Sequence, residues 1–215
     1  MKKIFMFLLM LMLVLNSYAQ ANVTKFLGMP VDGSREKIEK QLKEKGFRKY
    51  LYLRDTLEGE FNGRNVMLRI LTNKDKVWRI AVMDSNPTRD ESQIINRFNE
   101  LYNQFLNNPK YALIGGEMID REEDISYEMI VKNKTYEAGF YQLGTQEEID
   151  EILLSKYTEK QLSNPSKKLK KEMKEYVEEI SKNKIVWFAV DQNNGEYNIV
   201  IFYDNVYNQS NGEDL

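Results

Sequence analysis

Short turn sequences separate the strand-like stretches of this chain, and they constrain its fold more than any other feature. Asn62 and Gly63 stand between two such stretches, and an Asn-Gly pair is typical of a two-residue β-hairpin loop. Further turns are expected over residues 73–76, 133–134 and 193–195. Strands joined by tight turns run antiparallel. The sequence therefore predicts an antiparallel sheet built from meanders.

Helical periodicity alternates with these strands, which gives an α+β fold class with the helices packed on one face of the sheet. Strands are expected over 50–53, 57–61, 64–71, 77–84, 111–119, 125–131, 135–143, 185–190 and 196–204. Helices are expected over 32–46, 88–106, 145–154 and 165–180. Asp32 or Ser34 is the expected N-cap of the first helix, and Thr88 that of the second. In the strand that begins at Val77, alternation directs Trp78 and Ile80 toward the core.

The domain organisation follows from the same pattern. We expect an N-terminal α+β module over 20–110, a C-terminal α+β module over 111–204 and a flexible tail over 205–215. The segments Lys76–Val82 and Lys184–Val190 look alike, which is weak support for two similar modules. A single domain formed by both halves is the alternative.

The first nineteen residues have the layout of a secretory signal peptide. Two lysines precede an apolar run from Ile4 to Leu15, and small residues follow, with cleavage after Ala19 or Ala21. The run is shorter than the about 20 residues that span a bilayer, although a retained membrane anchor is the alternative. The chain has no cysteine, which excludes a lipid-anchored lipoprotein. We therefore expect an exported protein, periplasmic or secreted, with no stable membrane span after signal removal.

The composition excludes several chemistries. The chain contains neither cysteine nor histidine. Without histidine, Ser-His-Asp and Cys-His catalysis and ordinary zinc sites are excluded, and without cysteine the fold depends on its core alone. Removal of the signal leaves 29 basic and 33 acidic side chains, a net charge of about −4, which gives no general attraction to nucleic acid. We expect no cofactor, no metal and no nucleic-acid partner.

Acidic side chains form two runs, over 120–124 and over 147–151, and either could supply the carboxylate pair of a glycosidase. Solvated turns and helix first turns explain both runs more simply. The alternation of Asp84, Asn86, Thr88 and Asp90 resembles the start of a calcium loop, but the glycine and the final glutamate of such a loop are missing. The lysine-rich stretch over 160–174 is interleaved with glutamates, which favours a solvated amphipathic helix.

Tyrosines offer the candidate binding residues. Tyr50, Tyr52, Tyr197 and Tyr203 belong to an aromatic set on strands and near their ends, and tyrosine is common in recognition surfaces. Ordinary cross-strand packing is the alternative role of these side chains.

Four segments over residues 25–110 resemble a group of uncharacterised exported proteins of Bacteroides-type bacteria. They are Phe26–Gly33, Lys45–Phe47, Gly59–Gly63 and Lys76–Ile80. The resemblance implies export and transfers no activity and no functional residue.

The sequence favours a non-enzymatic binding or interaction module of the bacterial envelope. Its expected partner is a protein, a peptide or a glycan, bound through the sheet or its connections. A carboxylate-dependent hydrolase acting on envelope or dietary glycans is the alternative function.

Overall fold

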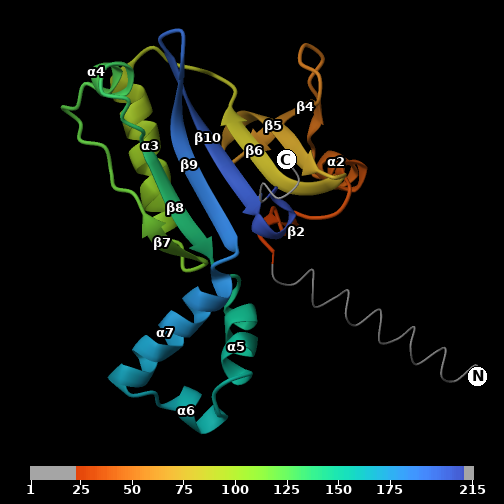
Figure 1. Ribbon diagram of the computed structural model, residues 1–215, viewed down its shortest axis with the longest axis vertical. Helices are drawn as coiled ribbons and strands as arrows, with labels where there is room; N and C mark the ends of the chain where they lie inside the picture. Colours follow the sequence, from red (N-terminus) through yellow and green to blue (C-terminus); the bar gives the residue numbers. More distant parts are fainter. Residues whose placement is uncertain (1–22, 211–215) are drawn as a thin grey trace, which may run out of the picture.

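The computed structural model describes residues 23–210, so the expected signal peptide and the last five residues of the expected tail lie outside the described part. One eight-stranded antiparallel sheet dominates the fold (Figure 1). Its strands, in spatial order, are β3 (Arg48–Lys49), β4 (Thr56–Phe61), β5 (Arg64–Asn73), β6 (Lys76–Asp84), β10 (Glu196–Asn205), β9 (Lys184–Asn193), β8 (Glu137–Gln142) and β7 (Tyr111–Gly115). A small hairpin of β1 (Lys25–Phe26) and β2 (Met29–Pro30) precedes it.

Helices complete the α+β class that the sequence predicts. They are α2 (Arg35–Glu44), α3 (Glu91–Leu106), α4 (Ile125–Ile130), α5 (Gln146–Leu154), α6 (Glu159–Ser163) and α7 (Lys167–Ser181), with a 3₁₀ turn at Val206–Asn208. None of the helices within residues 23–210 has both the length and the apolar composition needed to cross a bilayer.

Three of the expected turns, at 62–63, 73–76 and 193–195, join neighbouring strands as hairpins, whereas residues 133–134 follow α4 and join no two strands. Asn62 and Gly63 have φ angles of +52° and +71°, and Asn194 and Gly195 have +53° and +75°. Positive φ at both central residues defines the type I′ turn, which matches the twist of the flanking strands. The antiparallel meander is therefore confirmed.

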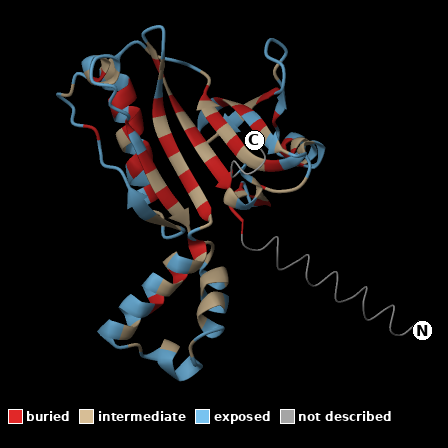
Figure 2. Cartoon of the chain, viewed as in Figure 1, coloured by how far each residue is buried: buried red, intermediate tan, exposed pale blue. Residues whose placement is uncertain are grey.

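The core lies on one face of the sheet. Leu68, Val82, Ile201 and Phe188 lie side by side on four neighbouring strands and are buried. The side chains of α2 and α3 belong to the same buried cluster, and Phe98 of α3 packs on Phe188 with ring centroids 5.0 Å apart. Figure 2 shows the alternation of buried and half-buried residues as bands along the strands. We call the face under α2 and α3 the covered face and the opposite one the open face.

The two halves of the chain meet inside this sheet, where β6 pairs with β10. Each half contributes a four-stranded meander, β3 to β6 or β7 to β10. The similar segments Lys76–Val82 and Lys184–Val190 occupy the fourth strand of one meander and the third strand of the other. Helix α3 lies before residue 110 in sequence but contacts β7, β9 and β10. The division at 110/111 stays a prediction.

Two expected strands and one expected helix cap differ from those in the structure. Residues 50–53 form turns rather than a strand. Residues 125–131, expected as a strand, form α4, because the Asp124 side chain accepts from the amide of Tyr127 and the Glu91 carboxylate accepts from the amide of Ile125. Asp90, not Thr88, is the N-cap of α3.

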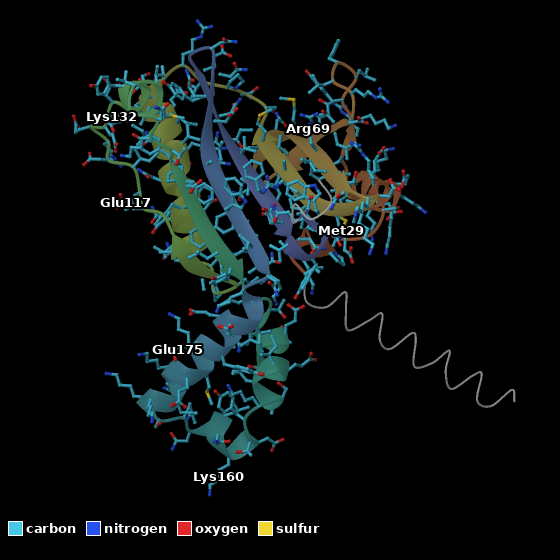
Figure 3. All side chains as sticks on the ribbon, viewed as in Figure 1. Met29, Arg69, Glu117, Lys132, Lys160 and Glu175 are labelled. Atoms are coloured by element: carbon cyan, nitrogen blue, oxygen red, sulfur yellow. The ribbon has the colours of Figure 1, made fainter. Side chains whose placement is uncertain are left out.

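Helices α5, α6 and α7 form an arm between β8 and β9 that extends away from the sheet (Figure 1). Lysines on α7 lie 3.7 to 3.8 Å from glutamates one turn later, as in Lys171 with Glu175 and Lys174 with Glu178. Figure 3 shows Lys160 at the far end of the arm. The solvated amphipathic helix expected from the lysine-rich stretch is therefore present.

The expected tail begins with an anchored segment. Asn205 is buried, and its Nδ2 atom donates to the carbonyl of Val31 at 2.8 Å. Asn208 donates to Asp32 and to the carbonyl of Val77, both at 2.8 Å. Because these amide side chains satisfy backbone groups of other strands, residues 205–208 are part of the fold.

Candidate functional site: the open face of the sheet

The open face combines large apolar side chains with arginine. Because side chains alternate along a strand, each strand that buries one set of residues presents the other set here. At the centre of the sheet the open face consists of Met67, Arg69, Trp78, Arg79, Ala81, Met83, Trp187, Ala189, Val200, Phe202 and Asp204. Most of these apolar side chains are half-exposed.

A compact group around Arg79 occupies the middle of the open face. The Arg79 guanidinium binds the Asp204 carboxylate through Nε and Nη2, both at 2.6 Å. Trp187 donates its indole N–H to the same carboxylate at 2.9 Å and stacks on Phe202 with ring centroids 4.2 Å apart. Together with Trp78, these residues are called the Arg79 cluster.

The aromatic rings surround the Arg79 guanidinium. Its central carbon lies 4.4 Å from the ring of Trp78, 4.5 Å from Phe202 and 5.2 Å from Trp187. The Arg79 side chain is only 17% exposed, and Asp204 only 10%. The ion pair and the ring contacts hold each of these side chains in place.

Trp78 does not point to the core as the alternation predicts. The pairing of β5 with β6 shifts register between Leu71 and Thr72, next to this position. Val77 therefore takes the buried place, and Trp78 reaches the open face. Both tryptophans of the chain thus lie in the Arg79 cluster.

Two hollows flank the cluster. One, of about 570 Å³, is lined by Met67, Arg69, Trp78, Met83 and Phe202 among others. The second, of about 400 Å³, lies beside Trp187.

Of the arginines in or beside the first hollow, one has no acidic partner within the described residues and two have one. Arg69 is exposed and forms no ion pair within the described residues, whereas Arg35 at the edge lies 3.6 Å from Asp55. Arg79 is neutralised by Asp204. Arg69 is therefore the cation of this hollow that has no ion pair within residues 23–210.

The four predicted tyrosines do not share one surface. Tyr197 and Tyr203 lie on the covered face, whereas Tyr50 lines a hollow that also contains Met67 of the open face. Tyr50 and Tyr52 pack edge to face at 5.6 Å beside the β3–β4 connection. Tyr197 is buried on the covered face, where its hydroxyl bonds Ser126. Tyr203 lines a pocket on the covered face. Phe202, the neighbour of Tyr203, is the member of the aromatic set that reaches the open face.

The acidic runs have structural partners. Asp124 caps α4, and Glu148 completes the capping box of Thr145 and pairs with Lys25. A hydrogen bond from Lys134 lowers the pKa of the Glu123 carboxyl, whereas the general acid of a glycosidase needs a raised pKa. Glu123 therefore lacks the raised pKa of a general acid.

The calcium-like residues are engaged as well. Asp84 binds Arg97 of α3 through two hydrogen bonds of 2.8 and 3.2 Å, and both residues are buried. Asp90 accepts hydrogen bonds from the backbone at the start of α3. Within residues 23–210, no group of three or more acidic side chains is placed to hold a metal ion.

A neighbouring hollow of about 440 Å³, which shares Met67 with the first hollow, contains two carboxylates, those of Glu58 and Glu60 on β4. Arg48 donates from Nε to Glu58 at 2.9 Å, and the side chain of Arg48 is 80% exposed. This solvated arrangement holds Glu58 in an ion pair at the edge of the sheet.

Comparison with known protein families, with curated proteins and with solved structures finds no match for this chain.

Proposed function

We propose that the protein is an exported, non-enzymatic binding module that holds a folded protein partner against the open face of its sheet. The observation that carries the proposal is the Arg79 cluster. It gathers both tryptophans, Phe202 and an arginine on the uncovered side of the central strands.

The residue types support a protein partner. Tryptophan, arginine, phenylalanine and methionine are enriched at protein interfaces, and tryptophan and arginine dominate their binding energy. Met67 and Met83 extend the apolar area next to the cluster, and methionine adapts its shape to a partner. Because the cluster is already ordered, binding requires little further loss of side-chain freedom.

Charge favours a partner with an acidic side chain near an apolar patch. Arg69 stands in the first hollow without an ion pair within the described residues. An acidic group that meets Arg69 beside Trp78 would be partly shielded from water, which strengthens the attraction. We infer that an acidic side chain of the partner enters this hollow.

The expected signal peptide over residues 1–19 supports an extracytoplasmic location, periplasmic or secreted. The resemblance to exported proteins of Bacteroides-type bacteria points in the same direction. The proposed partner is therefore another protein of the envelope or of the surroundings of the cell.

Photocrosslinking in the cells that make the protein tests this function. A benzophenone amino acid replaces Met83 on the open face in one variant and the exposed Glu44 of α2 in a control variant. The proposal predicts one discrete crosslinked protein for the Met83 variant, lost when Arg69→Glu is added, and none for the control. Crosslinks of equal yield at both positions, or none at the open face, would overturn the proposal.

A further inference from the structure

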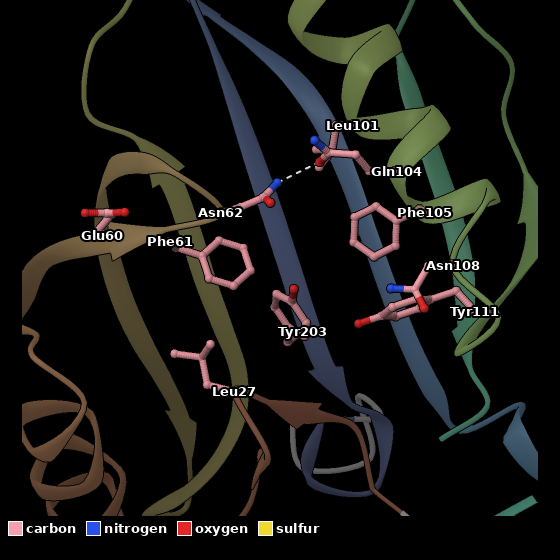
Figure 4. A pocket seen from close by; sticks show the side chains of 10 residues that line it. All are labelled: Leu27, Glu60, Phe61, Asn62, Leu101, Gln104, Phe105, Asn108, Tyr111 and Tyr203. Atoms are coloured by element: carbon pink, nitrogen blue, oxygen red, sulfur yellow. Dashed lines mark hydrogen bonds between the residues drawn. The ribbon is translucent and has the colours of Figure 1, made fainter. Parts of the chain in front are cut away.

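A pocket on the covered face lies between the first meander and helix α3. It opens between the β4–β5 hairpin and the C-terminal part of α3, and its volume is about 280 Å³ (Figure 4). Phe61 and Leu27 form one wall, and Leu101 and Phe105 form the other. Tyr203 of β10 lies between the two walls.

The hydroxyl of Tyr203 is the unusual group of this pocket. The side chain is only 4% exposed, and its ring packs on Phe26 with centroids 4.8 Å apart. Within the described residues its hydroxyl has no hydrogen-bond partner, although buried tyrosine hydroxyls normally have one. Figure 4 shows this hydroxyl directed into the pocket, toward the side of Gln104 and Asn62.

This hydroxyl is a neutral donor. Burial raises the pKa of Tyr203 well above its ordinary value, so the O–H proton stays in place at any physiological pH. The hydroxyl faces the open pocket, where a ligand with a hydrogen-bond acceptor would receive its hydrogen bond. The pocket thus contains a specific polar contact within an aromatic surrounding.

The pocket offers no cationic group to a ligand. Its ten lining residues include neither lysine nor arginine. Glu60 is the acidic member, and its carboxylate points away from the rings in Figure 4. Tyr111, on the far wall, has a pKa raised by burial and is also neutral. An anionic ligand would lose its hydration there without compensation.

The rim is polar and closes one side of the pocket. Asn62 donates from Nδ2 to the Oε1 atom of Gln104 at 2.7 Å, which links the β4–β5 turn to α3. Asn108 lies on the same rim. These amides place polar groups at the mouth of the pocket, while the aromatic rings line its interior.

We propose that this pocket binds a small uncharged molecule with a flat apolar body and one carbonyl-type acceptor, to which the Tyr203 hydroxyl donates a hydrogen bond. The four aromatic rings of Phe61, Phe105, Tyr111 and Tyr203 suit a flat body. The site lies on the covered face and is independent of the partner surface on the open face. It therefore adds a small-molecule function to the proposed protein interaction.

Titration with prodan, an uncharged naphthalene ketone whose emission shifts to the blue in apolar surroundings, tests the site. The full-length protein should bind prodan saturably with a blue shift. Tyr203→Phe removes only the hydroxyl and should weaken binding by about three- to tenfold, the range of one neutral hydrogen bond. Tyr102→Phe is the matched control, since Tyr102 is a buried tyrosine whose hydroxyl bonds the carbonyl of Gly116 outside the pocket.

Two further measurements keep the outcome clear. Gln104→Trp fills the mouth from an exposed position and should abolish prodan binding, whereas Asn96→Trp, also exposed on α3, should not. Acetonaphthone, a neutral ketone, should displace prodan, and the naphthoate anion should not. Absence of saturable binding, equal affinity in Tyr203→Phe and wild type, or displacement by naphthoate as readily as by acetonaphthone would each overturn the proposal.

Discussion

Two nearly buried aspartates of this chain each bind an arginine side chain and fix its position. Asp84 holds Arg97 under α3, and Asp204 holds Arg79 and Trp187 on the open face. Both carboxylates are nearly buried, and both bind an arginine through two oxygens. One aspartate therefore fixes the guanidinium under α3, and the other fixes the guanidinium among the aromatic rings of the open face.

Asp84→Asn should lower the free energy of unfolding by about 3–5 kcal/mol, because it leaves the charge of Arg97 buried without a counter-ion. Urea denaturation measures the change. Glu100→Gln on the same helix is the control, since its pair with Arg64 spans 3.8 Å between exposed side chains and contributes about 0–1 kcal/mol. A loss below about 1 kcal/mol for Asp84→Asn would contradict the structural role.

At the scale of elements, the sequence predicts those turns and helices that are determined by interactions between neighbouring residues. The Asn-Gly turn, the capping box at Thr145 and the apolar spacing of α3 are visible in sequence because neighbouring residues produce them. Helix α4 was not predicted, because its capping depends partly on Glu91, which is remote in sequence. Trp78 was placed in the core because the register shift opposite it is a tertiary feature.

The Arg79 cluster cannot be predicted from the sequence either, because it also depends on tertiary contacts. Arg79, Trp187 and Phe202 come from three strands that only the β6–β10 pairing brings together. The sequence contains part of the signal, since Phe202 and Asp204 alternate with the buried Ile201 and Tyr203. Sequence alone cannot show which strand lies next to which.

Gly116 provides a test of a single element, the end of β7. Its φ is +102°, and an added Cβ would lie 2.5 Å from the carbonyl oxygen of Glu137. Gly116→Ala should lower the free energy of unfolding by about 2–3 kcal/mol, because both the backbone angle and the contact become unfavourable.

The neighbouring Gly115 is the matched control, since an added Cβ there meets no atom within 4 Å. Gly115→Ala should change the stability by less than about 0.5 kcal/mol. Thermal unfolding of both variants checks the pair. Equal effects of the two substitutions would contradict the geometry of this bend.

At the scale of the molecule, the two faces of the sheet differ in what they carry. The covered face carries the core and the Tyr203 pocket, and the open face presents the Arg79 cluster over the strands that join the two halves. Helices on one side only leave a broad surface of half-exposed apolar side chains on the other. Surfaces of this kind mark interaction sites on soluble proteins.

The affinity of the crosslinked partner for variants of this surface tests the central claim most directly. Calorimetric titration with the purified partner should give a Kd at least about tenfold higher for Trp78→Ala than for wild type, as expected of an interface residue that carries much of the binding energy. Ile130→Ala, at a 62% exposed isoleucine of α4 on the side of the covered face, should change the Kd by less than about twofold. If Trp78→Ala binds as tightly as Ile130→Ala, the open face is not the partner surface.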